Sequence, residues 1–214
     1  MFPEQVEALI QHIGPFLKPY QNESGRSILS PTLQVIIGLR FMAGNCYYYD
    51  LGDLYSCSAA SAMRAVNYFT EAVLQGLRGG IGWPQSDEEA KLIGQKFAIK
   101  GGNRFFAGAV DGTLIEVVAP LQSRLTFVTR HHTTCINAVI VADTDMVIRY
   151  FWAGAGGSKH DDAVLRISSL QRAFDAGFRP FPGAVLIADS GYGDRSWLLA
   201  YRQNHPPAYE NLYQ

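Results

Sequence analysis

Two aspartates stand in apolar stretches in the second half of the sequence. Asp111 lies inside an apolar run and precedes Gly112, and Asp189 closes the apolar run 184–188. A carboxylate in such surroundings is costly to bury unless it is paired, hydrogen-bonded or bound to a cation. Carboxylate oxygens suit Mg²⁺ and Mn²⁺, and two such ions can support phosphoryl transfer on nucleic acid. The simpler alternative is that each aspartate only caps a turn or a helix.

Other residues suggest chemistry less strongly. The glycines of segment 153–160 (AGAGGSKH) suggest a phosphate-binding loop, but the established glycine-rich patterns are absent. His131, His132 and His160 could contact a metal or a phosphate, although a histidine in a loop is more often simply solvated. Ser190 lacks the glycine pattern that surrounds a hydrolase nucleophile.

The elements around the two aspartates are predicted from hydrophobic patterning. We expect strands at 106–118, 135–142 and 146–152, a loop at 153–160, a helix from Asp161 or Asp162 to near Gly177, and a strand at 184–188. The last strand is wholly apolar, as is typical of a central parallel strand covered on both faces. The order β-β-β-α-β is the opening topology of a ribonuclease-H-like α/β fold. There the first and fourth strands are neighbours, which would bring Asp111 and Asp189 together.

The first half of the chain is predicted to be helical. A helix begins at Ser30-Pro31, a short one covers 50–55, and a third runs over 59–77 after a turn at 57–58. A short helix, a tight turn and a longer helix are typical of a helix-turn-helix, and a plain helical hairpin is the alternative. The third helix offers Ser61, Arg64, Asn67 and Tyr68 as candidate DNA contacts.

Composition sets limits on these readings. The chain has 214 residues, 48% of them hydrophobic, and a net charge of −1. This favours a folded protein over a disordered one and excludes a strongly basic nucleic-acid binder. Its three cysteines form no close pair, the start does not resemble a signal peptide, and no apolar run could span a membrane. We expect a helical region at 1–80, a connector at 81–104 and the ribonuclease-H-like domain at 105–214.

Four motifs resemble one known family when taken in order. They are Gly-Asp-Leu-Tyr-Ser-Cys-Ser at 52–58, Ala-Val-Asp-Gly-Thr at 109–113, Gly-Ser-Lys-His-Asp-Asp-Ala-Val-Leu at 157–165, and ADSGYGDRSWLL at 188–199. The chain from about residue 30 onward resembles the PIF/Harbinger-type DDE transposases and the harbinger transposase-derived nucleases, which are DDE superfamily endonucleases.

The resemblance implies a metal-dependent endonuclease. Asp111 and Asp189 would be the first two acids of the catalytic triad and would hold Mg²⁺ or Mn²⁺, with Asp161 and His160 in supporting roles. The family's third acid, usually a glutamate on a later helix, would lie beyond Gln214. The nuclease fold would then be incomplete at its C-terminal end, and this chain would be weak or inactive.

The sequence also departs from the family pattern. Leu114 and Thr134 stand where the family commonly has histidines. Glu210 is the only acid after Asp194 and a poor candidate for the third ligand, and the final ENLYQ also resembles the remnant of a protease tag.

The resemblance further implies a set of partners. They are DNA and a separate Myb-like DNA-binding protein, with a homo-oligomer left open, no membrane, and residence in the nucleus or also the cytoplasm. Two alternatives remain. One is a domesticated, catalytically inactive DNA-binding or protein-interaction module, and the other is an aspartate-based hydrolase acting on small phosphates.

Overall fold

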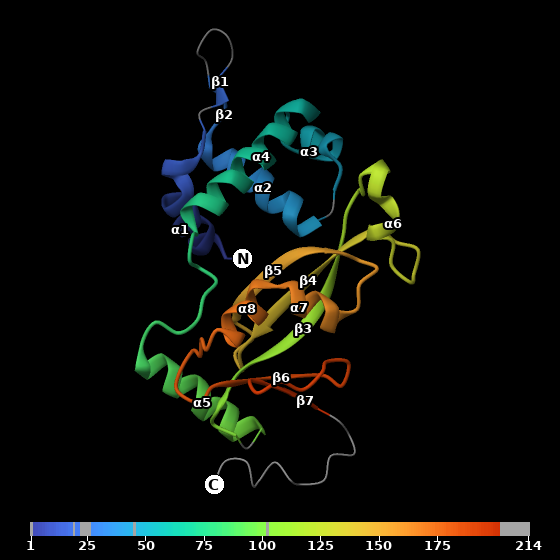
Figure 1. The fold of residues 1–214 in the computed structure, drawn as a ribbon. Coiled ribbons are helices and arrows are strands. Elements are labelled where there is room, and N and C mark those ends of the chain that lie inside the picture. Colours follow the sequence, from blue (N-terminus) through green and yellow to red (C-terminus); the bar gives the residue numbers. More distant parts are fainter. Residues whose placement is uncertain (1, 19, 22–26, 45, 102, 202–214) are drawn as a thin grey trace. The chain divides into compact units, whose positions relative to one another are not determined.

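The chain divides into two compact units, Met1–Gly80 and Ile81–Gln214. The structure is a computed structural model that describes residues 2–18, 20–21, 27–44, 46–101 and 103–201. Among the described residues, the first unit contains two clusters of buried apolar side chains and the second unit contains one. Figure 1 shows the helices and strands of both units. The two units are therefore described one at a time.

The first unit is mainly helical. Its elements are α1 (Pro3–Ile13), the short 3₁₀ turn η1 (Gly14–Phe16), β1 (Tyr20–Gln21), β2 (Ser27–Leu29), α2 (Pro31–Gly44), α3 (Tyr48–Leu54) and α4 (Ala59–Gly76). Serine caps start the two long helices, as predicted. The Ser30 hydroxyl accepts the Leu33 amide at 3.2 Å, and the Ser58 hydroxyl accepts the Ser61 amide at 3.1 Å.

A tight turn joins α3 to α4. The turn includes Ser56, whose φ is +53°, and a Cβ on Gly52 would lie 2.7 Å from the carbonyl oxygen of Cys57. Only a glycine allows the helix and the turn to approach this closely. The apolar side of α4 is buried from Ala62 to Phe69, whereas Leu77, expected inside this helix, lies beyond its end and is exposed. The arrangement of α3, the turn and α4 thus comes from local caps and one close backbone contact.

The second unit is a mixed sheet flanked by helices. Its elements are α5 (Asp87–Gly101), β3 (Phe106–Glu116), η2 (Leu121–Ser123), α6 (Arg124–Phe127), β4 (Cys135–Ala142), β5 (Ile148–Gly156), α7 (Asp161–Ile167), α8 (Ser169–Asp175), β6 (Val185–Ala188) and β7 (Leu198–Ala200). The strand order is β5-β4-β3-β6-β7. β4 pairs antiparallel with β3 and β5, whereas β6 pairs parallel with β3 and β7. The expected α/β class is confirmed, with the first and fourth strands of the unit as neighbours.

Three details of this unit differ from the prediction. β5 begins at Ile148 and continues to Gly156, because two register shifts let its small residues pair with β4. The single helix predicted after Asp161 is two helices, because Ser168 is extended and caps α8 through the Gln171 amide. β7 was not predicted, because three residues are too short for a periodic pattern.

Helices cover the sheet, and the hydrophobic core lies between the helices and the strands. α7 and α8 contact β3, β4 and β5, and the core beneath them includes Trp197, Phe174 and Leu186 (Figure 1). α5 lies within the segment expected to be a connector, and it packs against β3 through Phe97 and Phe106. No described helix of either unit has the length and hydrophobicity that a bilayer crossing requires.

A buried aspartate holds the β4–β5 turn. The Asp143 carboxylate accepts the Asp145 and Val147 amides at 2.8 and 3.0 Å and the Arg149 Nε at 2.8 Å. Arg149 also binds Glu89 of α5 at 2.6 Å, so the turn is tied to that helix. Burial raises the pKa of Asp143, but these hydrogen bonds and the Arg149 charge outweigh it, so the pKa is lowered.

This lowered pKa predicts an acid-sensitive fold. The Asp143 contribution to stability is present above the pKa of the unfolded chain, about 4, and is lost as pH falls through the folded value. We expect Asp143→Asn to lower the free energy of unfolding by about 2 kcal/mol at pH 7 and to lose less on acidification than the wild type. Urea unfolding at pH 7 and pH 3 measures both. Equal pH dependence in wild type and Asp143→Asn would contradict this role, and exposed Glu88→Gln is the control.

Candidate active site

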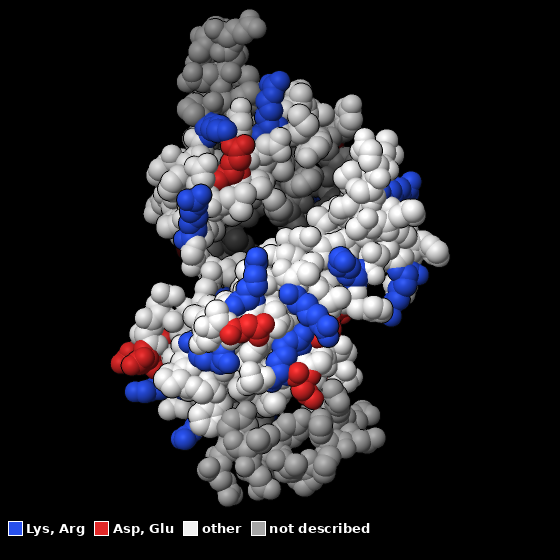
Figure 2. Space-filling view, viewed as in Figure 1, with Lys and Arg blue, Asp and Glu red and all other residues white. Residues whose placement is uncertain are grey.

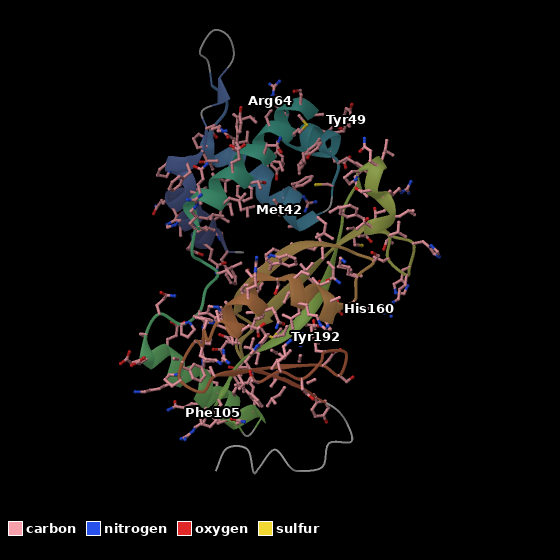
Figure 3. All side chains as sticks on the ribbon, in the orientation of Figure 1. Met42, Tyr49, Arg64, Phe105, His160 and Tyr192 are labelled. Carbon is pink, nitrogen blue, oxygen red and sulfur yellow. The ribbon has the colours of Figure 1, made fainter. Side chains whose placement is uncertain are left out.

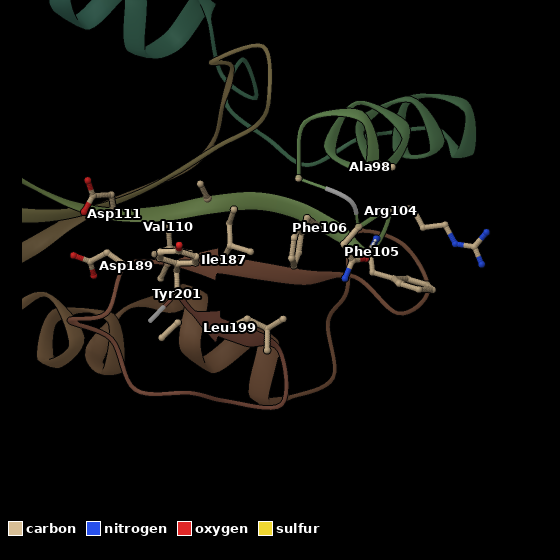
Figure 4. A pocket seen from close by; sticks show the side chains of 15 residues that line it. Ala98, Arg104, Phe105, Phe106, Val110, Asp111, Ile187, Asp189, Leu199 and Tyr201 are labelled. Carbon is tan, nitrogen blue, oxygen red and sulfur yellow. Dashed lines mark hydrogen bonds between the residues drawn. The ribbon is translucent and has the colours of Figure 1, made fainter. Parts of the chain in front are cut away.

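Strand pairing places the two candidate aspartates next to each other. Val110 of β3 pairs with Ala188, the last residue of the parallel strand β6. Asp111 is the next residue of β3, and Asp189 directly follows the end of β6. Side chains that follow paired residues by the same step point to the same face, and neighbouring strands lie about 4.8 Å apart. Figure 4 shows the two carboxylates side by side. The parallel register therefore brings together two acids that are 78 residues apart in sequence.

Both carboxylates are exposed and each is held by a nearby amide. The Gly112 amide donates to Asp111 Oδ1 at 2.8 Å, and the Gly191 amide donates to Asp189 Oδ1 at 3.0 Å. A carboxylate can accept several hydrogen bonds or ligands through its two oxygens. Each aspartate is thus oriented by its own backbone and keeps the capacity to bind a cation.

The pair stands at one end of an open, mainly apolar pocket. The pocket has a volume of about 1160 Å³, and its walls include Phe106, Ile187 and Leu199. Arg104 lies at the other end (Figure 4). Apolar walls reduce the local polarity and so strengthen the attraction between a cation and the two carboxylates.

The loop after Asp189 is anchored to the start of α7. Asp162 Oδ1 accepts the Gly193 amide at 3.1 Å and Arg195 Nη2 at 2.8 Å. Arg195 also donates to Gln171 of α8 at 2.8 Å. Burial raises the pKa of Asp162, but the Gly193 amide and Arg195, helped by Arg166, outweigh it and lower the pKa. Asp162 therefore stays ionised and fixes the loop that carries Asp189.

Asp161 lies against Gly112 of β3. A Cβ on Gly112 would fall 2.3 Å from Asp161 Oδ1, so this carboxylate is in close contact with the Gly112 backbone. Asp161 Oδ1 also accepts Asn137 Nδ2 of β4 at 2.9 Å. His160 precedes α7, is exposed, and makes no cap bond with its side chain. The motif at 157–165 is thus tied to β3 through Asp161 rather than through His160.

The carboxylates of Asp111 and Asp189 are suitable ligands for a hard divalent cation, but they are only part of a full set of ligands. Among the described residues, no three histidine, cysteine, aspartate or glutamate side chains are grouped so as to hold a metal. Mg²⁺ commonly uses only one or two carboxylates and keeps several waters, so the pair Asp111 and Asp189 is chemically adequate for one ion. Glu210, considered as a third acid, lies outside the described residues.

The weaker chemical candidates have structural positions. Gly154 and Gly156 belong to β5, and a Cβ on Gly156 would meet the Thr126 carbonyl oxygen at 2.1 Å, so this stretch is a packed strand and not a phosphate loop. His131 and His132 are exposed in the segment between β3 and β4. These residues are not brought to the aspartate pair by any contact that the structure describes.

The helix–turn–helix residues are distributed over α4. Arg64 and Asn67 are exposed, whereas Ser61 is buried with its hydroxyl 2.9 Å from that of Ser58. Tyr68 is half-buried beneath Lys18, whose ammonium lies 5.6 Å from its ring centre. Figure 3 shows the Arg64 side chain on this helix. An exposed face of α4 is therefore formed by Arg64 and Asn67.

Sequence reasoning missed two residues near the site. Asp162 was treated only as an alternative helix start, because its partner Arg195 is 33 residues away. Tyr192 was part of a quoted motif but was given no role, and its hydroxyl is buried without a hydrogen-bond partner among the described residues. The only sequence signal for Asp162 was the double aspartate at 161–162, and the only one for Tyr192 was its place in the motif at 188–199.

Comparison with known proteins gives a matching family and several relatives. Residues 110–212 match the family of DDE superfamily endonucleases, so the chain carries a DDE endonuclease domain. The chain is homologous to the human protein named “Putative nuclease HARBI1”, with 30% identity over 203 residues. The rat and Xenopus laevis proteins of that name are 28% and 26% identical over 200 and 171 residues.

The alignments cover different shares of this chain and of its relatives. The alignments with the human and rat proteins cover 92% of this chain but 56% of those proteins, and the Xenopus alignment covers 80% and 49%. The chain thus spans about half the length of the relatives it matches. No solved structure matches it.

Two arginines that bind the same carboxylate allow a matched test of the loop anchor. The Arg195 side chain is 13% exposed and the Arg166 side chain is 69% exposed, and both bind Asp162. We expect Arg195→Gln to lower the free energy of unfolding by about 2–4 kcal/mol, because Asp162 loses a shielded partner. Arg166→Gln should cost less than about 1 kcal/mol. Urea unfolding at pH 7 compares them, and equal losses would refute the anchor.

The contact between Gly112 and Asp161 gives a second prediction. Gly112→Ala should displace the Asp161 carboxylate and cost about 1–3 kcal/mol, because the new methyl group has no space. Gly101→Ala is the control, since a Cβ there would meet nothing within 4 Å. Thermal unfolding of both variants measures the difference. A Gly112→Ala protein as stable as Gly101→Ala would mean that Asp161 is not held against β3.

Proposed function

We propose that this protein is a metal-dependent endonuclease that cleaves DNA phosphodiester bonds through Asp111 and Asp189. The observation that carries the proposal is the parallel register that sets the two acids side by side at the rim of a pocket. DDE superfamily endonucleases generally use divalent metals, and this chain carries such a domain. The name of its human relative describes a nuclease.

The proposed chemistry divides between the cation and the protein. Mg²⁺ or Mn²⁺ held by Asp111 and Asp189 would activate the attacking oxygen and stabilise the leaving one. The protein's own part is positioning: backbone amides orient the carboxylates, and Asp162 with Arg195 fixes the loop after β6. A third acid, which the family resemblance implies, would complete the ligand set.

Basic side chains give the DNA backbone a place to bind. On the face shown in Figure 2, Lys and Arg side chains gather over α7, α8 and the segment that carries α6. Exposed basic residues of these elements and the adjoining loops are Arg124, Arg130, Lys159, Arg166 and Arg172. Phosphate contacts of this kind supply affinity without reading sequence. These residues give this face a local positive charge, although the net charge of the whole chain is only −1.

The first unit is proposed to add a second DNA contact. The exposed residues Arg64 and Asn67 of α4 fit the second helix of a helix-turn-helix, which enters the major groove. Residence in the nucleus and association with a separate Myb-like protein follow from the same proposal.

The metal site makes the function testable. In the whole protein, Asp111→Asn or Asp189→Asn should reduce Mn²⁺-dependent nicking of supercoiled plasmid by about a hundredfold or more. The cation contributes several kcal/mol, and about 1.4 kcal/mol corresponds to a factor of ten in rate. Exposed Glu88→Gln of α5 is the control and should nick normally.

The same assay separates the enzyme from its main alternative. Both aspartate variants should still bind DNA, because the basic side chains are unchanged. A wild-type protein that binds DNA but does not nick it with Mn²⁺ or Mg²⁺ would favour an inactive binding module. Unchanged nicking by both aspartate variants would refute the assignment of the site.

A further inference from the structure

The connection between β3 and β4 carries strongly exposed apolar side chains. It comprises residues 117–134, contains η2 and α6, and is called the β3–β4 arm below. Figure 1 shows α6 beyond the ends of the two strands. Val118 is 99% exposed, and Leu121 and Leu125 are each 87% exposed. A group of apolar side chains left in water on one element indicates a surface that binds a partner.

The backbone of the arm is hydrogen-bonded at its base. The Val117 amide donates to the Thr134 carbonyl oxygen at 2.9 Å, and the Thr129 amide donates to the Thr133 carbonyl oxygen at 2.8 Å. Thr129 is only 4% exposed, and its hydroxyl lies 2.8 Å from that of Thr133. The exposed apolar side chains therefore stand on a base that is built into the fold.

The glycine-rich stretch at the end of β5 packs directly against the arm. A Cβ on Gly156 would lie 2.1 Å from the Thr126 carbonyl oxygen, and a Cβ on Gly157 would lie 2.9 Å from that of Phe127. The Ser158 hydroxyl also donates to the Thr126 carbonyl oxygen at 2.9 Å. This stretch, which suggests a phosphate-binding loop in the sequence, instead fixes the arm to the sheet.

The charge of the arm favours an anionic partner. Residues 117–134 include no aspartate or glutamate, whereas Arg124 and Arg130 are both exposed. Duplex DNA offers phosphates to arginine side chains and, in its minor groove, sugar and base surfaces against which leucine side chains can pack. η2 and α6 have three and four residues, so the arm is too short to act as a recognition helix in the major groove.

The arm also lies where DNA bound at the aspartate pair can reach it. Asp111 stands six residues before Val117 on the same extended backbone, which corresponds to about 20 Å. A duplex rises about 3.4 Å per base pair, so this distance equals about six base pairs. Asp189 follows the carboxyl end of β6, which is parallel to β3. A duplex that runs along β3 from the aspartate pair therefore meets the arm.

We propose that the β3–β4 arm binds the minor groove of duplex DNA, with Leu121 and Leu125 as an apolar wedge against the base pairs and Arg124 on a phosphate. Leucine side chains in this position partly unstack a base step and bend the duplex toward its major groove. The bend brings more of the phosphate backbone to the basic face of the second unit. This inference rests on the proposed function and adds to it how the DNA beside the cleaved bond is held.

The experiment measures binding and bending of a short duplex, labelled with a donor and an acceptor dye at its two ends, by the 214-residue chain in EDTA. The double variant Leu121→Ala/Leu125→Ala should bind about tenfold more weakly and leave the duplex as straight as free DNA. Its melting temperature should match the wild type, because both side chains are exposed. Ile99→Ala is the matched control: Ile99 is 85% exposed on α5, and this variant should bind and bend DNA normally.

The salt dependence of binding separates the leucines from the arginine. Arg124→Gln should reduce the slope of log affinity against log salt by about one, because one phosphate contact is lost. The double leucine variant should keep the wild-type slope, because apolar contacts release no counterions. A leucine variant that lowers the slope as Arg124→Gln does would contradict the assignment of the two roles.

Other outcomes overturn the inference at different levels. A wild type that binds the duplex without bending it, or a double variant that still bends it, refutes the wedge and leaves the proposed function in place. If the wild type sediments as a dimer that the double variant dissociates, while bending is unchanged, the arm is an interface between copies of this chain. If the wild type binds no duplex at all, the proposed function fails and the inference falls with it.

Discussion

The parallel pairing of β3 with β6 is the constraint on which the rest of the second unit depends. It alone brings Asp111 beside Asp189, and a shift of one residue would turn one of the two side chains to the opposite face of the sheet. Two adjacent carboxylates repel each other in the absence of a cation, so the surrounding structure must hold them in place. The antiparallel pairing of β3 with β4 fixes one side of this arrangement, and the core under α7 and α8 fixes the other.

Polar groups near the site hold its residues in position at some cost in the stability of the fold. Asp162 and Arg195 are both largely shielded from solvent, and together they connect the start of α7, the loop after β6 and α8. The Tyr192 hydroxyl is shielded too, but it has no partner among the described residues. A packed apolar cluster at these positions would be at least as stable. The use of polar residues here is consistent with a site that must place several oxygen atoms relative to one another.

The first unit follows simpler physical rules. Its helices begin at serine caps, its tight turn depends on Gly52, and its cores are separate from that of the sheet. Such a unit is built from local interactions. In the proposed function the first unit adds a DNA contact, and the second unit carries the aspartate pair together with its own basic face.

The sequence by itself determined the features that depend on neighbouring residues. The caps at Ser30 and Ser58, the apolar strand ending at Ala188, and the two aspartates followed from short patterns whose physics is local. Only the tertiary structure decided the extension of β5, the pairing of β7, and the choice of Asp162 as the anchor of the loop. These features depend on contacts between residues far apart in the chain, such as Asp162 with Arg195, and on which oxygen atoms find partners once the core has excluded water. No local pattern encodes such contacts, because each one exists only after the sheet has formed.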